Sequence, residues 1–67
     1  MRITCKNNDG IAIIYVDGMP YMEIRWDHLA RRYRIYEYGT NILVTSRSSM
    51  EACLGYIAEY LRKSESQ

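Results

Sequence analysis

The side chains that could do catalytic chemistry are few and lie far apart in the sequence. The single histidine, His28, follows Asp27, and the two cysteines are Cys5 and Cys53. Nucleophilic catalysis needs a nucleophile within hydrogen-bond reach of a base, and neither cysteine neighbours His28 in the chain. A tight metal site needs several nitrogen, sulfur or carboxylate donors together, and His28 has no such companions. We therefore predict no catalytic residues, no metal site, no cofactor and no enzymatic activity.

Tyrosine and arginine are the residues whose abundance indicates binding. The chain has 7 Tyr and 0 Phe. A buried tyrosine hydroxyl needs a hydrogen-bond partner, so the choice of Tyr over Phe throughout predicts rings that are half exposed. Tyr and Arg are also enriched among the residues that dominate binding energies. The alternative, in which tyrosines merely suit half-buried strands and arginines solvate them, stays open.

Length and charge limit the architecture and the class of partner. A chain of 67 residues is one small domain, which we place at residues 1–63, with a polar tail at 64–67. The net charge of +1 creates no overall attraction to nucleic acid or membrane. The longest apolar run, Ile11–Val16, is too short to span a bilayer. Because no secretion leader is evident, we expect a cytosolic protein with reduced thiols, although a Cys5–Cys53 bridge stays open.

One segment, Ser48–Arg62, predicts a proper helix. Ser48 and Glu51 have the spacing of a capping box. Apolar residues recur at helical spacing and form one stripe: Met50, Cys53, Leu54, Ile57 and Leu61. If this stripe is buried, Leu54→Ala or Ile57→Ala should each cost about 2–5 kcal/mol.

The chain before the helix is predicted to be strand and turn. Segments of alternating or β-branched residues lie at 2–6, 11–16, 21–27, 32–38 and 42–45. Turn residues at Asn7–Gly10 and Asp17–Pro20, and a hairpin loop at His28–Arg31, separate them. Short successive turns favour antiparallel pairing. We predict an α+β fold, an antiparallel β-meander of four to five strands with one C-terminal helix packed on one sheet face.

A single helix can cover only one face of this sheet. The covered face is predicted to hold Ile3, Cys5, Met22, Ile24, Trp26, Tyr33 and Ile35, joined by either Ile11 and Ile13 or Ala12, Ile14 and Val16. The opposite face should be open and bind the partner through Tyr21, Arg25, Arg32, Arg34, Tyr36 and Tyr38. Because exposed positions contribute little to folding, we expect substitution of Arg25, Arg34 and Tyr36 to leave thermal stability nearly unchanged.

The partner of the open face is predicted to be a protein. A Tyr/Arg surface interleaved with Glu23 and Asp27 is close to neutral, and small chains of this build, for instance phage- or plasmid-borne ones, often act as inhibitors or adaptors. The alternative is a nucleic acid, with phosphates held by Arg25, Arg32 and Arg34 and bases stacked on tyrosines. Steep salt dependence of binding would favour the alternative.

The order of elements over Tyr21–Leu61, three strands followed by a covering helix, resembles that of the AP2 and integrase arm-binding domains. The resemblance implies a sheet that reads a DNA groove. It rests on element order without a shared motif, so it assigns no role to any residue.

The helix offers a surface for self-association. Tyr56 and Tyr60 lie one turn apart, with Ala52 and Gly55 nearby, and could form a helix–helix contact in a homodimer. Small domains often gain stability by oligomerising. In the alternative, Tyr56 and Tyr60 close over the edge of the sheet and Gly55 is a tolerated surface glycine.

Overall fold

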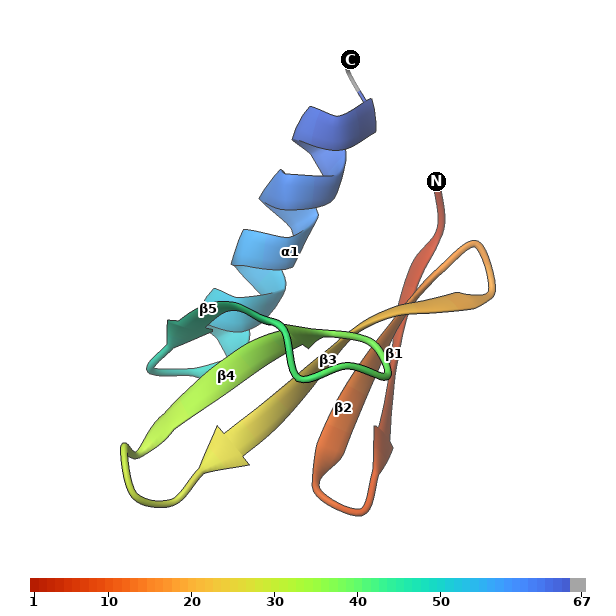
Figure 1. The fold of residues 1–67 in the computed structure, drawn as a ribbon. Helices are drawn as coiled ribbons and strands as arrows, with labels where there is room; N and C mark the ends of the chain where they lie inside the picture. The colour runs from red at the N-terminus through yellow and green to blue at the C-terminus, as the bar shows by residue number, and fades with distance from the viewer. Residues whose placement is uncertain (66–67) are drawn as a thin grey trace.

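The computed structural model describes residues 1–65 and confirms the predicted α+β meander (Figure 1). The elements in chain order are β1 (Ile3–Asn8), β2 (Ile11–Val16), β3 (Met19–Asp27), β4 (Arg32–Glu37), β5 (Leu43–Arg47) and α1 (Met50–Glu65). All neighbouring strands pair antiparallel, in the spatial order β1-β2-β3-β4-β5. The helix lies on one side of the sheet, where it contacts β4 and β5.

Two tight hairpins arise from the same dipeptide. Asp9-Gly10 joins β1 to β2, and Asp17-Gly18 joins β2 to β3. All four residues have positive φ, 53° and 80° in the first pair and 51° and 83° in the second. Two consecutive positive φ angles match the right-handed twist of the flanking strands, and Asp-Gly adopts them readily. Both turns were predicted at these places, but the predicted stretches were too long, because Asn7 and Asn8 belong to β1 and Met19 and Pro20 to β3.

The register of the sheet shifts at two places. Ile14 pairs with Met22 while Tyr15 pairs with Pro20, so Tyr21 is an extra residue in β3. A second shift separates Ile35 from Tyr36 in the pairing of β4 with β5. Such bulges bend a strand and redirect side chains, and neither was predicted.

The core lies between α1 and the middle of the sheet. Its buried members are Ala12, Ile14, Met22, Ile24, Ile35, Cys53, Ile57 and Leu61. From β2 it is therefore the set Ala12, Ile14 and half-buried Val16 that faces the helix. Four predictions were wrong at the borders of the core. Ile3 and Cys5 are exposed because β1 lies at the edge of the sheet away from α1. Trp26 is 39% exposed and Leu54 is 40% exposed.

The start of α1 lies one residue later than predicted. The Ser49 hydroxyl accepts the N–H of Ala52 at 3.1 Å, and the Ser49 carbonyl accepts the N–H of Cys53 at 3.1 Å. Ser49 is thus the N-cap, and the capping box proposed for Ser48 and Glu51 is wrong. The helix continues past Arg62 to Glu65, so two residues of the predicted tail are helical; the rest of that tail, 66–67, lies outside the described residues.

The cysteines are both free thiols, Cys5 exposed on β1 and Cys53 on the buried face of α1. Burial raises the pKa of the Cys53 thiol, although the guanidinium of Arg47 acts in the opposite direction. Within residues 1–65, α1 does not have the length and apolar character that crossing a membrane requires.

Candidate functional site

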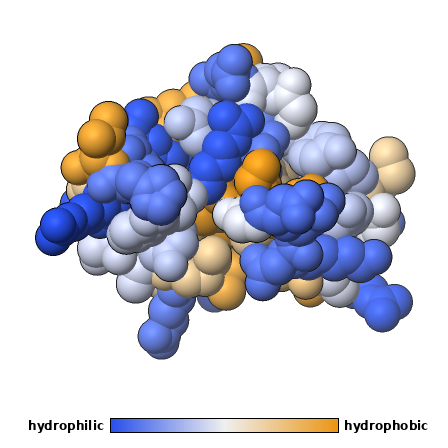
Figure 2. Space-filling view, turned by 90° about the horizontal axis from the view of Figure 1, so that it is seen from below, coloured by the Kyte–Doolittle hydropathy of each residue, from blue (hydrophilic) through white to orange (hydrophobic). Residues whose placement is uncertain are grey.

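The face of the sheet opposite α1 brings together charged and aromatic side chains from β3 and β4. Arg25 pairs with Arg34, and Glu23 pairs with Tyr36, across the two strands. Directly paired residues project from the same face. We call Glu23, Arg25, Asp27, Arg34 and Tyr36 the β3–β4 face. From below the view of Figure 1, hydrophilic side chains surround and separate small apolar patches (Figure 2).

Each arginine of the β3–β4 face is held by a carboxylate of the same face. Arg25 Nε lies 3.1 Å from Glu23 Oε2, and Arg34 Nη2 lies 2.9 Å from Asp27 Oδ2. The guanidinium of Arg25 also stacks over the ring of Tyr36, 4.2 Å from its centroid. A guanidinium over an aromatic ring is electrostatically attractive. The face is therefore organised in advance, and the charges of Arg25 and Arg34 are locally neutralised. Among residues 1–65, Arg32, which pairs with Asp27 across the strands, donates only to the Ser46 hydroxyl.

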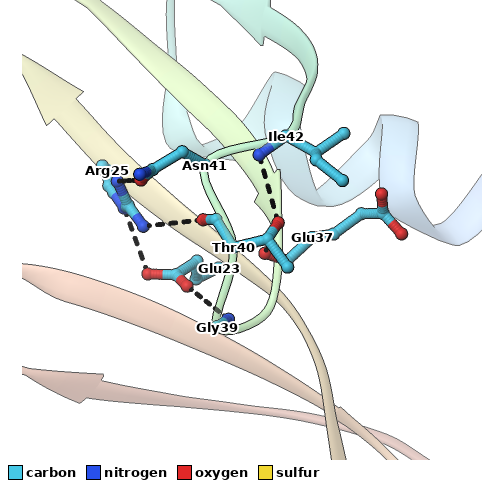
Figure 3. A network of polar contacts seen from close by, with 7 residues as sticks. All are labelled: Glu23, Arg25, Glu37, Gly39, Thr40, Asn41 and Ile42. Carbon is cyan, nitrogen blue, oxygen red and sulfur yellow. Dashed lines mark hydrogen bonds and ion pairs between the residues drawn. The ribbon is translucent and has the colours of Figure 1, made fainter.

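The loop between β4 and β5 folds back over part of this face (Figure 3). The N–H of Gly39 donates to Glu23 Oε1 at 2.9 Å, and Arg25 Nη2 donates to the Thr40 carbonyl at 3.1 Å. Arg25 Nη1 also approaches Asn41 Oδ1, at 3.4 Å. The loop itself is tied by Thr40, whose hydroxyl donates to the Glu37 carbonyl at 2.9 Å and accepts the N–H of Ile42 at 3.1 Å.

The hydrogen bonds between the β4–β5 loop and the β3–β4 face make this face less open than predicted. Glu23 is only 7% exposed, because the loop covers it while Arg25 and Gly39 occupy its two oxygens. The expectation of a uniformly exposed face was wrong at this position. Arg25, Arg34 and Tyr36 are all half-buried rather than free, so the expected thermal neutrality of replacing the three together is also withdrawn.

Glu23 is predicted to make folding sensitive to acid. Burial alone would raise the pKa of Glu23, but the hydrogen bonds from Arg25 and Gly39 outweigh it, and the pKa lies below its ordinary 4.5. A carboxylate whose pKa is lowered by folding stabilises the protein above its unfolded pKa and loses that contribution as the pH falls through the folded value. We expect the difference in free energy of unfolding between the wild type and Glu23→Gln to shrink as the pH falls below 4.5. Urea titrations at successive pH values measure it, and a constant difference would contradict it.

A hollow of about 350 Å³ opens beside the β3–β4 face, at the end nearest the β3–β4 turn. Its lining comes from both strands and the turn: Arg25, Trp26, Asp27, His28, Leu29, Arg34 and Tyr36. The volume is at the small end of the range for ligand-binding clefts, and the lining mixes apolar, aromatic and charged groups. Such a hollow suits one inserted side chain of a macromolecule.

The six predicted binding residues do not all converge. Arg25, Arg34 and Tyr36 line the hollow. Arg32, paired with Asp27, lies at its margin and donates from Nε to Ser46 Oγ at 3.3 Å. Tyr38 follows β4, and its N–H donates to the Tyr21 carbonyl at 3.2 Å while its side chain is exposed.

Tyr21 does not join the β3–β4 face. As the extra residue of the β3 bulge it lies beside Tyr60 of α1. Burial, the neighbouring Tyr60 and the charge of Glu37 raise the pKa of Tyr21. The alternation rule assigned Tyr21 to the open face because it assumes an uninterrupted strand.

The predicted dimer contact is divided between exposed and packed residues. Ala52 and Gly55 are exposed, and a Cβ built on Gly55 meets no atom within 4 Å. Tyr56 packs against the core under the guanidinium of Arg47, which lies 4.8 Å from the ring centroid. The ring centroid of Tyr60 lies 6.2 Å from that of Tyr56. This arrangement agrees with the alternative in which the two tyrosines close over the sheet edge.

Sequence reasoning missed the role of the β3–β4 turn. Asp27 Oδ1 accepts the N–H of Leu29 at 3.0 Å and of Ala30 at 3.2 Å. These backbone donors, first that of Ala30, lower the pKa of Asp27 despite some desolvation, and the nearby charge of Arg34 adds to the effect. An aspartate that ends a strand is a known signal for such side-chain-capped turns, and it could have indicated this role.

No protein-family model, curated protein or solved structure matches the chain in the three comparisons. Function is therefore inferred from the geometry of the β3–β4 face.

Proposed function

We propose that this protein is a non-enzymatic binding module that docks its β3–β4 face on a protein partner, as an inhibitor or adaptor. The observation that supports this most directly is that Arg25, Tyr36 and Arg34 lie together beside the hollow. Ion pairs and a cation–π contact hold them in place. Arginine and tyrosine in a desolvated centre are typical of binding hot spots. Because the loop and carboxylates already hold these side chains, little conformational entropy remains to be lost on binding.

Local neutralisation favours a protein over a nucleic acid. Arg25 and Arg34 each contact a carboxylate. To hold phosphates, as the nucleic-acid alternative requires, they would have to bind next to Glu23 and Asp27, whose charge repels phosphate. Nucleic acid is therefore the second candidate, and it predicts the steep salt dependence that accompanies counterion release.

The chemistry of the cysteines and the histidine supports a role without catalysis. The thiolate is the reactive form of cysteine, and the raised pKa of buried Cys53 keeps its thiol protonated. His28 Nδ1 accepts the indole N–H of Trp26 at 3.2 Å, so one ring nitrogen is already occupied. We also propose a cytosolic location, because two free cysteines are typical of a reducing compartment.

Arg34→Ala is predicted to abolish partner capture. Arg34 lines the hollow, and its side chain is 40% exposed. Because its ion pair with Asp27 is partly exposed, losing the pair should cost about 1 kcal/mol or less and leave the chain folded. Binding should weaken at least about tenfold, the loss typical of a hot-spot arginine. The measurement is capture from nuclease-treated lysate of the source organism by the immobilised wild type and variant, with bound proteins identified by mass spectrometry.

Arg62→Ala is the matched control. Arg62 likewise has one acidic partner, Glu59, but its side chain is 72% exposed against 40% for Arg34, and it lies on α1. It should capture the same protein as the wild type. Equal capture by Arg34→Ala and the wild type, or loss of capture after nuclease treatment alone, would contradict the proposal.

A further inference from the structure

The tip of the β3–β4 turn presents an apolar side chain entirely to solvent. Leu29 is 98% exposed. The turn that carries it is rigidly defined, since Asp27 accepts the N–H groups of Leu29 and Ala30 and is itself held by Arg34. A scattered exposed leucine needs no explanation, but this one is held at the rim of the hollow by a dedicated hydrogen-bonded turn.

The same tip contains the one arginine with an unfavourable backbone conformation among residues 1–65. Arg31 has φ of 53°, in the left-handed region. The other non-glycine residues with positive φ are aspartates, Asp9 and Asp17, which tolerate this region better. No hydrogen bond or ion pair of Arg31 offsets the strain within residues 1–65. Hairpin loops commonly need one residue in this region, and glycine would adopt it without strain. The conformation thus has a structural reason, whereas the choice of arginine motivates the hypothesis of a role outside the fold.

Charge at the tip selects the kind of partner. Arg31 and Arg32 have no carboxylate partner in the described chain, where Arg32 donates only to Ser46 Oγ, while Asp27 is already occupied by Arg34. A symmetric contact between the turns of two copies would bring their arginines together, which opposes that mode of docking. A bilayer surface is a poor fit because one projecting leucine provides little area for insertion.

Resting on the proposed function, we propose that the β3–β4 turn is the specificity anchor of the interface. Leu29 inserts into an apolar socket of the partner protein, and Arg31 and Arg32 pair with carboxylates at the rim of that socket. The β3–β4 face supplies the adjoining contact area, and the turn decides which proteins fit.

Photo-crosslinking tests the anchor separately from the face. Benzoylphenylalanine is placed at Leu29 in one chain and at Tyr36 in another, and each is irradiated in nuclease-treated lysate of the source organism. We expect both positions to crosslink the same protein, with the peptide joined to position 29 containing apolar residues beside Asp or Glu. Unlabelled wild type should compete for both crosslinks, whereas Leu29→Ser or Arg31→Gly should need at least about tenfold more competitor.

Thermal unfolding measurements test whether Leu29→Ser and Arg31→Gly compete less well because they are unfolded. Leu29→Ser should keep the thermal midpoint of the wild type, and Arg31→Gly should have a midpoint at least as high, so lost binding would accompany equal or greater stability. Crosslinking at Tyr36 but not Leu29, or full competition by Leu29→Ser, would overturn the anchor and leave the proposed function standing. The absence of a crosslinked protein at both positions would overturn the proposed function itself. Leu29-dependent binding to phosphatidylserine vesicles or duplex DNA would overturn the choice of a protein socket.

Discussion

Ile57→Ala is expected to lower the free energy of unfolding by about 2–5 kcal/mol, the cost of truncating a fully buried isoleucine. Ile57 is 1% exposed and packs in the single core between α1 and the sheet. A short helix is marginal alone in water, so α1 depends on these contacts. Because small domains have total stabilities of only about 5–15 kcal/mol, this variant should unfold at a much lower urea concentration than the wild type.

Leu54→Ala is the matched control for Ile57→Ala. Leu54 lies on the same helix, but it is 40% exposed, and alanine has the higher helix propensity. We expect a loss of less than about 1 kcal/mol. Equal losses for the two variants would show that the helix stripe predicted from the sequence, and not the observed border of the core, describes the packing.

Arg25→Ala is expected to cost about 1–3 kcal/mol, because it leaves a nearly buried carboxylate with one of its two hydrogen-bond partners. Arg25 links Glu23 to the Thr40 carbonyl and stacks on Tyr36. Its loss should therefore also loosen the β4–β5 loop. The measurement is urea unfolding, with amide hydrogen exchange of Gly39 reporting the loop, since that N–H donates to Glu23.

A double-mutant cycle isolates the pair. Glu23→Gln removes the charge that Arg25 compensates, so Arg25→Ala should cost less in that background than in the wild type. Equal costs in both backgrounds would show that Arg25 acts through its contacts with the β4–β5 loop and Tyr36, and not through the charge of Glu23. Both outcomes concern the stability of the contacts among Glu23, Arg25 and the β4–β5 loop. Partner binding is tested separately by Arg34→Ala.

The meander could be predicted because its signals are local. Asp-Gly pairs specify tight hairpins, and the bounds of β2 match the run Ile11–Val16. The helix was found from its apolar spacing, but the capping-box spacing of Ser48 and Glu51 led to the wrong one of two adjacent serines, since Ser49 is the N-cap. The alternation of Ile3 and Cys5 is the same in an edge strand as in a covered one, so their exposure depends on where α1 lies and could not be predicted.

The site was only partly predictable, because its organisation depends on contacts distant in sequence. Arg25, Arg34 and Tyr36 were found from alternation. The burial of Glu23 depends on a loop 16 residues away along the chain, and the displacement of Tyr21 depends on a bulge. Neither leaves a periodic signal, whereas the role of Asp27 in the turn could have been recognised from residue type.

The most direct test of the account is to map the interface by amide chemical shifts while the captured protein is added to the labelled chain. We predict shift changes or broadening at Arg25, Arg34 and Tyr36 and in the turn at Leu29, with Ala52 and Gly55 on the exposed side of α1 unchanged. Changes confined to α1, with the β3–β4 face unaffected, would contradict the central claim that this face docks the partner.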